Sequence, residues 1–263
     1  MAGEENSKSA KSVWEKAEIE RSAHEALGMD AVSLQIVDVA RYENPPRSTV
    51  YPLEYSCYLL GDVRGKIAFD LGCGAGENTI LLAMRGARVI ALDISPELVE
   101  LARKRFEVMH VSTENVQFMV GSAYDITLAD ESVDVVFGIG ILHHLDLKLA
   151  QKEVYRILRK GGVAIFQEPV RDSNFIRLVR RLIPYKSADV SPFERPLTSK
   201  EIDSFAAPFK LVEKRAFFLP HVPIVGLLFP RLIRKACEWD GKILAAMPFL
   251  TRYAGIRVLR LTK

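Results

Sequence analysis

The chain has 263 residues, 49% of them apolar and 26% charged, which suits one α/β domain with additions and argues against global disorder. Its three cysteines, Cys57, Cys73 and Cys237, form no CxxC pair, so the spacing indicates neither a disulfide framework nor a metal site. The first residues are polar and no run reaches about 18 apolar residues. We therefore expect neither a secretory signal nor a spanning helix, and we expect a cytoplasmic protein.

Residues 1–59 are predicted to form a helical segment that precedes the main domain. Residues 8–27 show a loosely helical spacing of apolar side chains, and a proline-containing stretch at 44–48 then breaks regular structure. A short helix over 53–60 is expected to lead into the main domain.

Between residues 60 and 168, short apolar strands alternate with helices. The predicted strands are 67–71, 88–93, 116–120, 133–137 and 163–166, and the predicted helices are 78–85, 96–109 and 149–159. We expect Gly161 and Gly162 to stop the last of these helices. Short strands that are nearly continuously apolar, alternating with helices, are typical of a parallel sheet covered by helices on both faces.

After residue 169 the alternation stops. Residues 170–197 are basic and irregular, with one amphipathic helix expected over 173–184. Thr198 and Glu201 form a capping box that opens another helix. Two more strands are predicted at 210–218 and 255–261, separated by an apolar, proline-broken segment at 219–250. Residues 169–263 are therefore expected to supply cap insertions and the last two strands of the sheet.

A glycine-rich turn follows the first predicted strand. It begins at Asp70 and places glycines at 72, 74 and 76, which lets the backbone turn tightly and lets a ligand approach closely. Asp93 ends the second strand, where a carboxylate can accept hydrogen bonds from ribose hydroxyls. The GxGxG spacing places Glu77 where it would repel a pyrophosphate, and Asp70 suits a cationic ligand. S-adenosylmethionine, which has a sulfonium and an ammonium but no phosphate, fits these charges better than a nicotinamide dinucleotide does.

Five segments in order resemble the motifs of class I S-adenosylmethionine-dependent methyltransferases. The form is that of small-molecule enzymes related to the quinone-modifying methyltransferases. The segments are DLGCGAG at 70–76, ALDIS at 91–95, VGSAYD at 120–125, FGIGILHHL at 137–145 and RILRKGG at 156–162. The resemblance covers about residues 60–168 and implies a Rossmann-like seven-stranded methyltransferase fold with a C-terminal helical cap insertion.

The resemblance also implies a role for each site residue. The methionine part of the cofactor would be held by Asp70, Gly72, Cys73, Gly74 and Gly76. The ribose would bind Asp93, the adenine would lie against Ile94, Ser122 and Ala123, and the sulfonium would lie beside Gly138 and Ile139, with His143 in the pocket wall. Many relatives have Asp where Ser122 stands, so this contact departs from the family pattern.

His143 and His144 are the candidate proton acceptors, because imidazole titrates near neutral pH. The alternative is that the pair caps the following helix and lines the cofactor pocket. A base is needed only if the acceptor must lose a proton. Two other functions stay open: a nicotinamide-dependent oxidoreductase on a similar fold, and a non-catalytic S-adenosylmethionine-binding scaffold.

Charge is divided unevenly along the chain. Residues 1–168 carry 18 Lys and Arg against 25 Asp and Glu, whereas residues 169–263 carry 18 against 8. The basic part is either an ordinary solvated surface or a contact with something anionic. Together with the apolar segment after residue 217, it predicts a small, apolar or lipid-like acceptor and peripheral contact with an anionic membrane. A nucleic-acid substrate is disfavoured, because no Asn/Asp-Pro-Pro-Tyr signature follows the fourth strand.

Overall fold

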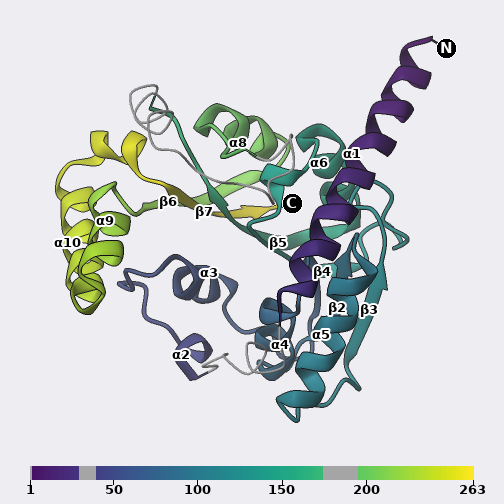
Figure 1. Cartoon of the computed structure of the whole chain (residues 1–263), viewed down its shortest axis with the longest axis horizontal. Coiled ribbons are helices and arrows are strands. Elements are labelled where there is room, and N and C mark those ends of the chain that lie inside the picture. Colours follow the sequence, from purple (N-terminus) through teal and green to yellow (C-terminus); the bar gives the residue numbers. More distant parts are fainter. Residues whose placement is uncertain (1, 30–39, 174–194) are drawn as a thin grey trace.

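A seven-stranded sheet forms the centre of the computed structural model (Figure 1). The structure describes residues 2–29, 40–173 and 195–263, and it describes the side chains of these residues from residue 15 onward. The strands are β1 (Ile67–Leu71), β2 (Arg88–Asp93), β3 (Val116–Val120), β4 (Val133–Ile139), β5 (Leu158–Pro169), β6 (Lys210–Phe217) and β7 (Ile256–Thr262). Their order is β3-β2-β1-β4-β5-β7-β6. Neighbours from β3 to β5 pair in parallel, and β7 runs antiparallel to both β5 and β6.

Helices cover both faces of this sheet, as the apolar strands predicted. They are α3 (Pro52–Leu60), α4 (Glu77–Met84), α5 (Pro96–Val108), α6 (Leu147–Ile157) and α8 (Ser199–Ala206). One core cluster joins Phe69 and Phe166 of the sheet to Phe205 of α8. Another joins Phe137 of the sheet to Tyr55 of α3. The predicted fold class is therefore confirmed.

The strand order reverses next to β1, and this reversal determines where a ligand can bind. From β1 the chain builds outward through β2 to β3, and it then returns to place β4 on the other side of β1. In open α/β sheets, the crevice outside the carboxyl ends of the strands at such a switch point is the usual ligand site.

Local signals account for several helix ends. The Ser95 hydroxyl accepts a hydrogen bond from the Leu98 backbone N–H at 3.2 Å, and α5 then begins at Pro96. Thr198 and Glu201 form the predicted capping box at the start of α8. One prediction is wrong: α6 ends at Ile157, not at the glycine pair. Leu158 is fully buried and already pairs with Val133, so Gly161 and Gly162 lie within β5.

The remaining described elements lie at the two sides of the sheet. α1 (Ala2–Leu27) packs on α5, and α2 (Ala40–Glu43) packs on α3. Between β6 and β7 the chain forms α9 (His221–Leu228), η3 (Pro230–Leu232), α10 (Ile233–Ala246) and η4 (Pro248–Tyr253). In Figure 1, α9 and α10 lie beside β6, on the opposite side of the view from α1. The helix predicted at 173–184 lies almost wholly outside the described residues. Within the described parts of the chain, no helix combines the length and apolar character needed to cross a bilayer.

Candidate functional site

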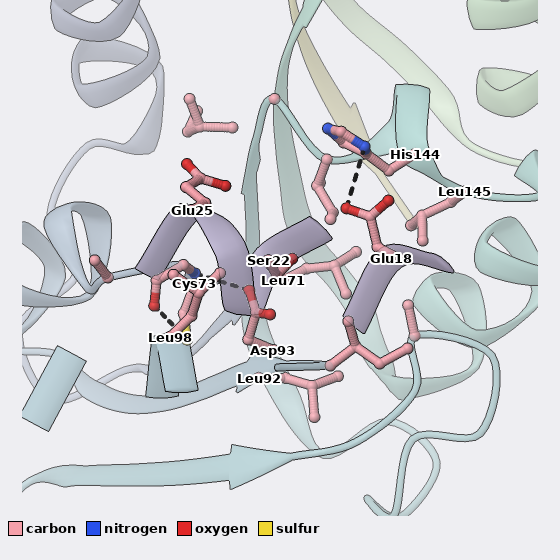
Figure 2. Close-up of a pocket in the computed structure, with 18 of the residues that line it drawn as sticks. Glu18, Ser22, Glu25, Leu71, Cys73, Leu92, Asp93, Leu98, His144 and Leu145 are labelled. Atoms are coloured by element: carbon pink, nitrogen blue, oxygen red, sulfur yellow. Dashed lines mark hydrogen bonds and ion pairs between the residues drawn. The ribbon is translucent and has the colours of Figure 1, made fainter. Parts of the chain in front are cut away.

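A cavity of about 480 Å³ opens at the carboxyl ends of β1, β2 and β4, where the strand order reverses. Its lining comes from the loops that follow these strands, from the loop after β3, and from α1. Figure 2 shows Glu18, Ser22 and Glu25 of α1 among the lining residues, with Glu18 directed at His144.

The glycine-rich turn between β1 and α4 has a shape that side chains would prevent. Gly72 has φ +72°, and a Cβ atom there would come within 2.5 Å of the Ile141 side chain. Gly76 has φ +85° and caps α4, and a Cβ atom there would lie 2.9 Å from that of Ala102. Glycine is therefore required at both positions to bring the turn against its neighbours.

Asp93 connects the end of β2 to this turn. One carboxylate oxygen accepts the Gly74 backbone N–H at 2.9 Å, and the other accepts the Ser95 backbone N–H at 3.0 Å. Burial raises the pKa of Asp93, whereas these backbone hydrogen bonds lower it. Because a carboxylate oxygen has two lone pairs, Asp93 can still accept hydrogen bonds from a ligand in the cavity.

Asp70 is fully buried near the end of β1. Its Oδ2 atom accepts the Thr79 hydroxyl at 2.6 Å, whereas its Oδ1 atom has no hydrogen-bond partner among the described residues. Burial raises the pKa of Asp70 to about 7, and the charges of Asp93 and Glu77 add to the rise. A buried oxygen without a donor indicates that a donor from a ligand or water completes the site.

Most of the predicted site residues come together at this cavity. Those in its lining are Gly72, Cys73, Gly74, Asp93, Ile94, Ser122, Ala123, Ile139, His143 and His144. Three others, Asp70, Gly76 and Gly138, are not in the lining. Gly138 instead makes room for Phe166, because a Cβ atom there would lie 2.7 Å from that ring.

Glu168, at the end of β5, holds the loop that carries His143. Its Oε1 atom accepts the backbone N–H groups of Ile141 at 3.0 Å and Leu142 at 2.8 Å. Its Oε2 atom lies 2.9 Å from Nδ1 of His143. A proton on Nδ1 donates to this carboxylate and leaves Nε2 as an acceptor, which is the arrangement that a proton-accepting histidine needs.

His144 lies against His143 with the two rings tilted by 42°, and it faces α1. The two ring centroids are 4.0 Å apart, and Nδ1 of His144 lies 3.4 Å from a Glu18 carboxylate oxygen without hydrogen-bond geometry. Burial alone would raise the pKa of Glu18, but His144 and Arg21 lower it to about 2. Glu18 is therefore ionised at neutral pH, and α1 presents a negative charge to the histidine pair.

Sequence reasoning missed the contribution of α1 to the site. Glu15, Glu18, Ser22 and Glu25 all line the cavity, and the Ser122 hydroxyl donates to Glu15 at 2.5 Å. Successive spacings of three, four and three residues put these side chains on one helical face, a signal that was present in the sequence.

The described part of the C-terminal insertions does not line this cavity. No described residue of 217–250 belongs to the lining, and α1 supplies one of its walls. Ile224 and Leu227 are instead exposed to solvent. That the cap insertions expected within 169–263 cover an acceptor stays a prediction, and residues 174–194 lie outside the described residues.

Comparisons with known proteins agree with this geometry. Residues 69–166 match a family model described as a methyltransferase domain. The demethylmenaquinone methyltransferase of Chlorobaculum parvum is 33% identical over 120 residues, which are 45% of this chain and 47% of that protein. The malonyl-acyl-carrier-protein O-methyltransferase of Serratia marcescens is 33% identical over 103 residues, which are 39% of this chain and 38% of that protein.

A solved structure is similar over a larger part of the chain. The geranyl diphosphate C-methyltransferase from Streptomyces coelicolor A3(2) has a TM-score of 0.56 at 16% identity, covering 79% of this chain and 78% of that one. This likeness concerns the fold. The chain spans about half the length, or less, of the two curated relatives above.

Proposed function

Residues 69–166 form a class I S-adenosylmethionine-dependent methyltransferase domain, and from this premise we propose that the chain methylates a small, apolar or amphiphilic acceptor. The observation that carries the proposal is one cavity at the switch point, where the glycine turn and Asp93 meet the histidine pair held by Glu168. The turn and Asp93 suit a nucleoside ligand, and the histidines lie where a second reactant can approach.

The charges of the cavity support S-adenosylmethionine as the cofactor. Five carboxylates line it, against Arg21 and the two histidines; they are Glu15, Glu18, Glu25, Glu77 and Asp93. Such a lining attracts a sulfonium and an ammonium and repels a pyrophosphate, so it disfavours the nicotinamide-dependent alternative. When bound, this cofactor supplies an activated methyl group, and the protein supplies binding and orientation.

Each part of the site then has a proposed task. Asp93 accepts hydrogen bonds from the ribose hydroxyls, and the turn from Gly72 to Gly76 holds the methionine part. Asp70, which is buried behind the turn and not in the lining, supplies negative charge for the ammonium. Ile94 and Ala123 pack against the adenine. Ser122 is bonded to Glu15, so it serves the adenine only after that hydrogen bond is exchanged.

His143 is the proposed proton acceptor when the acceptor group must lose a proton. Glu168 fixes its ring through Nδ1, so Nε2 is the atom that takes the proton. His144 is the weaker candidate, because its Nδ1 faces Glu18 of α1.

The proposed acceptor is amphiphilic, and the proposed partner is an anionic membrane that the protein contacts peripherally. Two observations support this: a relative is named for a demethylmenaquinone substrate, and residues 169–263 carry 18 basic against 8 acidic side chains.

Calorimetry with S-adenosylmethionine, S-adenosylhomocysteine and NAD tests the cofactor. Binding of the first two without NAD is expected, and tight NAD binding without the methyl donor would refute the proposal. Incubation with methyl-labelled cofactor and fractionated lipid extracts then tests transfer. A chain that binds the cofactor but labels no fraction would be the non-catalytic scaffold.

A further inference from the structure

The segment from α9 through η3 exposes large apolar side chains. Leu227 is 81% exposed and Phe229 is 58% exposed, and Ile224, Leu228 and Leu232 are also exposed. Five large apolar side chains are thus exposed within nine consecutive positions, 224–232. Single exposed apolar residues are common on protein surfaces, but a group of them usually marks a contact surface.

Basic side chains follow this apolar run directly. Arg231, Arg234 and Lys235 are all exposed, and no Asp or Glu occurs from residue 219 to residue 237. The next acidic residue, Glu238, accepts a hydrogen bond from Arg234 at 3.1 Å. The segment therefore combines exposed apolar groups with net positive charge, which is the chemistry that binds an anionic lipid surface.

The fold holds this segment as a projecting unit. Asp240 of α10 is buried and accepts the backbone N–H groups of Phe218 at 2.9 Å and Leu219 at 2.8 Å. These bonds fix the start of the segment at the end of β6, and α9 packs on α10 (Figure 1). Leu219 and Val222 are buried, so they anchor the segment while the residues from 224 to 232 face outward.

This segment and the cavity lie at the same edge of the sheet. Phe217, where β6 ends, and Pro169, where β5 ends, both pair with Ile256. The neighbouring β4 also ends at this edge, and Ile139 at its end lines the cavity. The segment that contains residues 224–232 therefore starts at the same edge of the sheet as the cavity.

From these observations we propose that residues 224–235 form a docking surface for an anionic phospholipid bilayer. Leu227, Leu228 and Phe229 enter the interfacial region, and Arg231, Arg234 and Lys235 lie at the level of the anionic headgroups. This surface rests on the membrane contact of the proposed function and names the residues that make it. Because the contact needs neither cofactor nor acceptor, its failure would leave the proposed methyl transfer untouched.

Sedimentation of the full chain with vesicles, without cofactor, tests the proposal. Vesicles of phosphatidylcholine alone are compared with vesicles that also contain phosphatidylglycerol, at low and at high salt. Binding to the anionic vesicles that weakens with salt is expected. The variant R231Q/R234Q/K235Q should lower the partition coefficient by roughly 100-fold, at about fivefold per basic residue. The variant L227S/L228S should lower it by about tenfold for each leucine.

Matched controls replace exposed residues elsewhere. They are R88Q/K104Q/K160Q for the charges and L211S/V212S for the apolar groups, and neither should change partitioning more than about twofold. Thermal melting checks that every variant is folded. Absence of binding to anionic vesicles at low salt overturns the proposal, as does binding that survives both surface variants. An oligomer that L227S/L228S dissociates, with vesicle binding unchanged, would assign the surface to a second copy of the chain.

Discussion

Replacing Asp70 with asparagine should stabilise the ligand-free protein at alkaline pH. Burial raises the pKa of Asp70 from its ordinary value of 3.8 to about 7. At a pH between 3.8 and about 7, the Asp70 side chain has lost its proton in the unfolded chain but retains it in the folded chain. The folded state then binds more protons, so the free energy of unfolding falls as pH rises through this window and stays lowered above pH 7.

The size of the effect follows from the shift. About three pKa units correspond to about 4 kcal/mol above pH 7, and to about 1.5 kcal/mol at pH 5, at 1.36 kcal/mol per unit. Asparagine has nearly the same shape as the protonated acid, and its amide oxygen can still accept the Thr79 hydroxyl. The stability gained by Asp70→Asn should therefore be about 3 kcal/mol larger at pH 8 than at pH 5.

Urea denaturation of wild type and Asp70→Asn at pH 5 and pH 8 measures this difference. All other titratable groups are shared by the two proteins, so their contribution to the pH dependence of stability cancels. Asp130→Asn, at an exposed carboxylate, is the control. If Asp70→Asn changes stability equally at both pH values, the buried carboxylate does not have the raised pKa and the reasoning is wrong. The same variant should weaken binding of S-adenosylmethionine by about 10- to 100-fold at pH 8, because it removes a charged acceptor.

Three further outcomes are expected. Asp93→Ala should weaken cofactor binding by about 1.5–3 kcal/mol in calorimetry, and unchanged affinity would remove Asp93 from the site. The variant should also lower the melting temperature, because it leaves the Gly74 and Ser95 backbone N–H groups without their acceptor. His143→Ala should lower turnover by about 10²- to 10⁴-fold with cofactor affinity retained, and Glu168→Gln should shift the pH profile of turnover; equal loss of affinity and turnover in His143→Ala would make His143 a pocket wall. Glu18→Gln should speed hydrogen exchange in residues 15–27 about fivefold at pH 7, whereas the exposed Glu20→Gln should not. Because the pKa of Glu18 is lowered from 4.5 to about 2 in the folded protein, ionised Glu18 stabilises the fold above about pH 4.5, and this stabilisation is lost as the pH falls towards 2. The exchange rates of wild type and Glu18→Gln should therefore converge in acid.

The parallel core was predictable from sequence, whereas the surroundings of the cavity were not. Strands such as 67–71 and 88–93 are apolar along most of their length, with charged residues only at or near their ends, and the positions of Gly72, Gly76 and Asp93 follow from backbone conformation and strand ends. The spacing of Glu15, Glu18, Ser22 and Glu25 showed that they share a helix face, but not what that face meets. The pairing of Glu168 with His143 and of Glu18 with His144 could not be predicted, because these partners lie 25 and 126 positions apart in the sequence. The division of the chain at 59/60 and 168/169 stays a prediction.

The end of α6 shows why local signals fail. The glycine pair is a strong stop signal, but the buried side chain of Leu158 joins the sheet earlier. Tertiary burial therefore determined this helix end, and the sequence contained only the weaker, local preference.

The acidic wall that α1 adds to the cavity has a consequence for the release of product. Methyl transfer converts a sulfonium into a neutral thioether, so the spent cofactor has one positive charge fewer than the molecule that entered. The α1 wall keeps a net negative charge, because Glu15, Glu18 and Glu25 outnumber Arg21, which pairs with Glu18 and Glu25. Such a wall would attract the first form more strongly than the second. A wall of this charge biases each exchange toward fresh methyl donor, so the helix would limit inhibition by accumulated product.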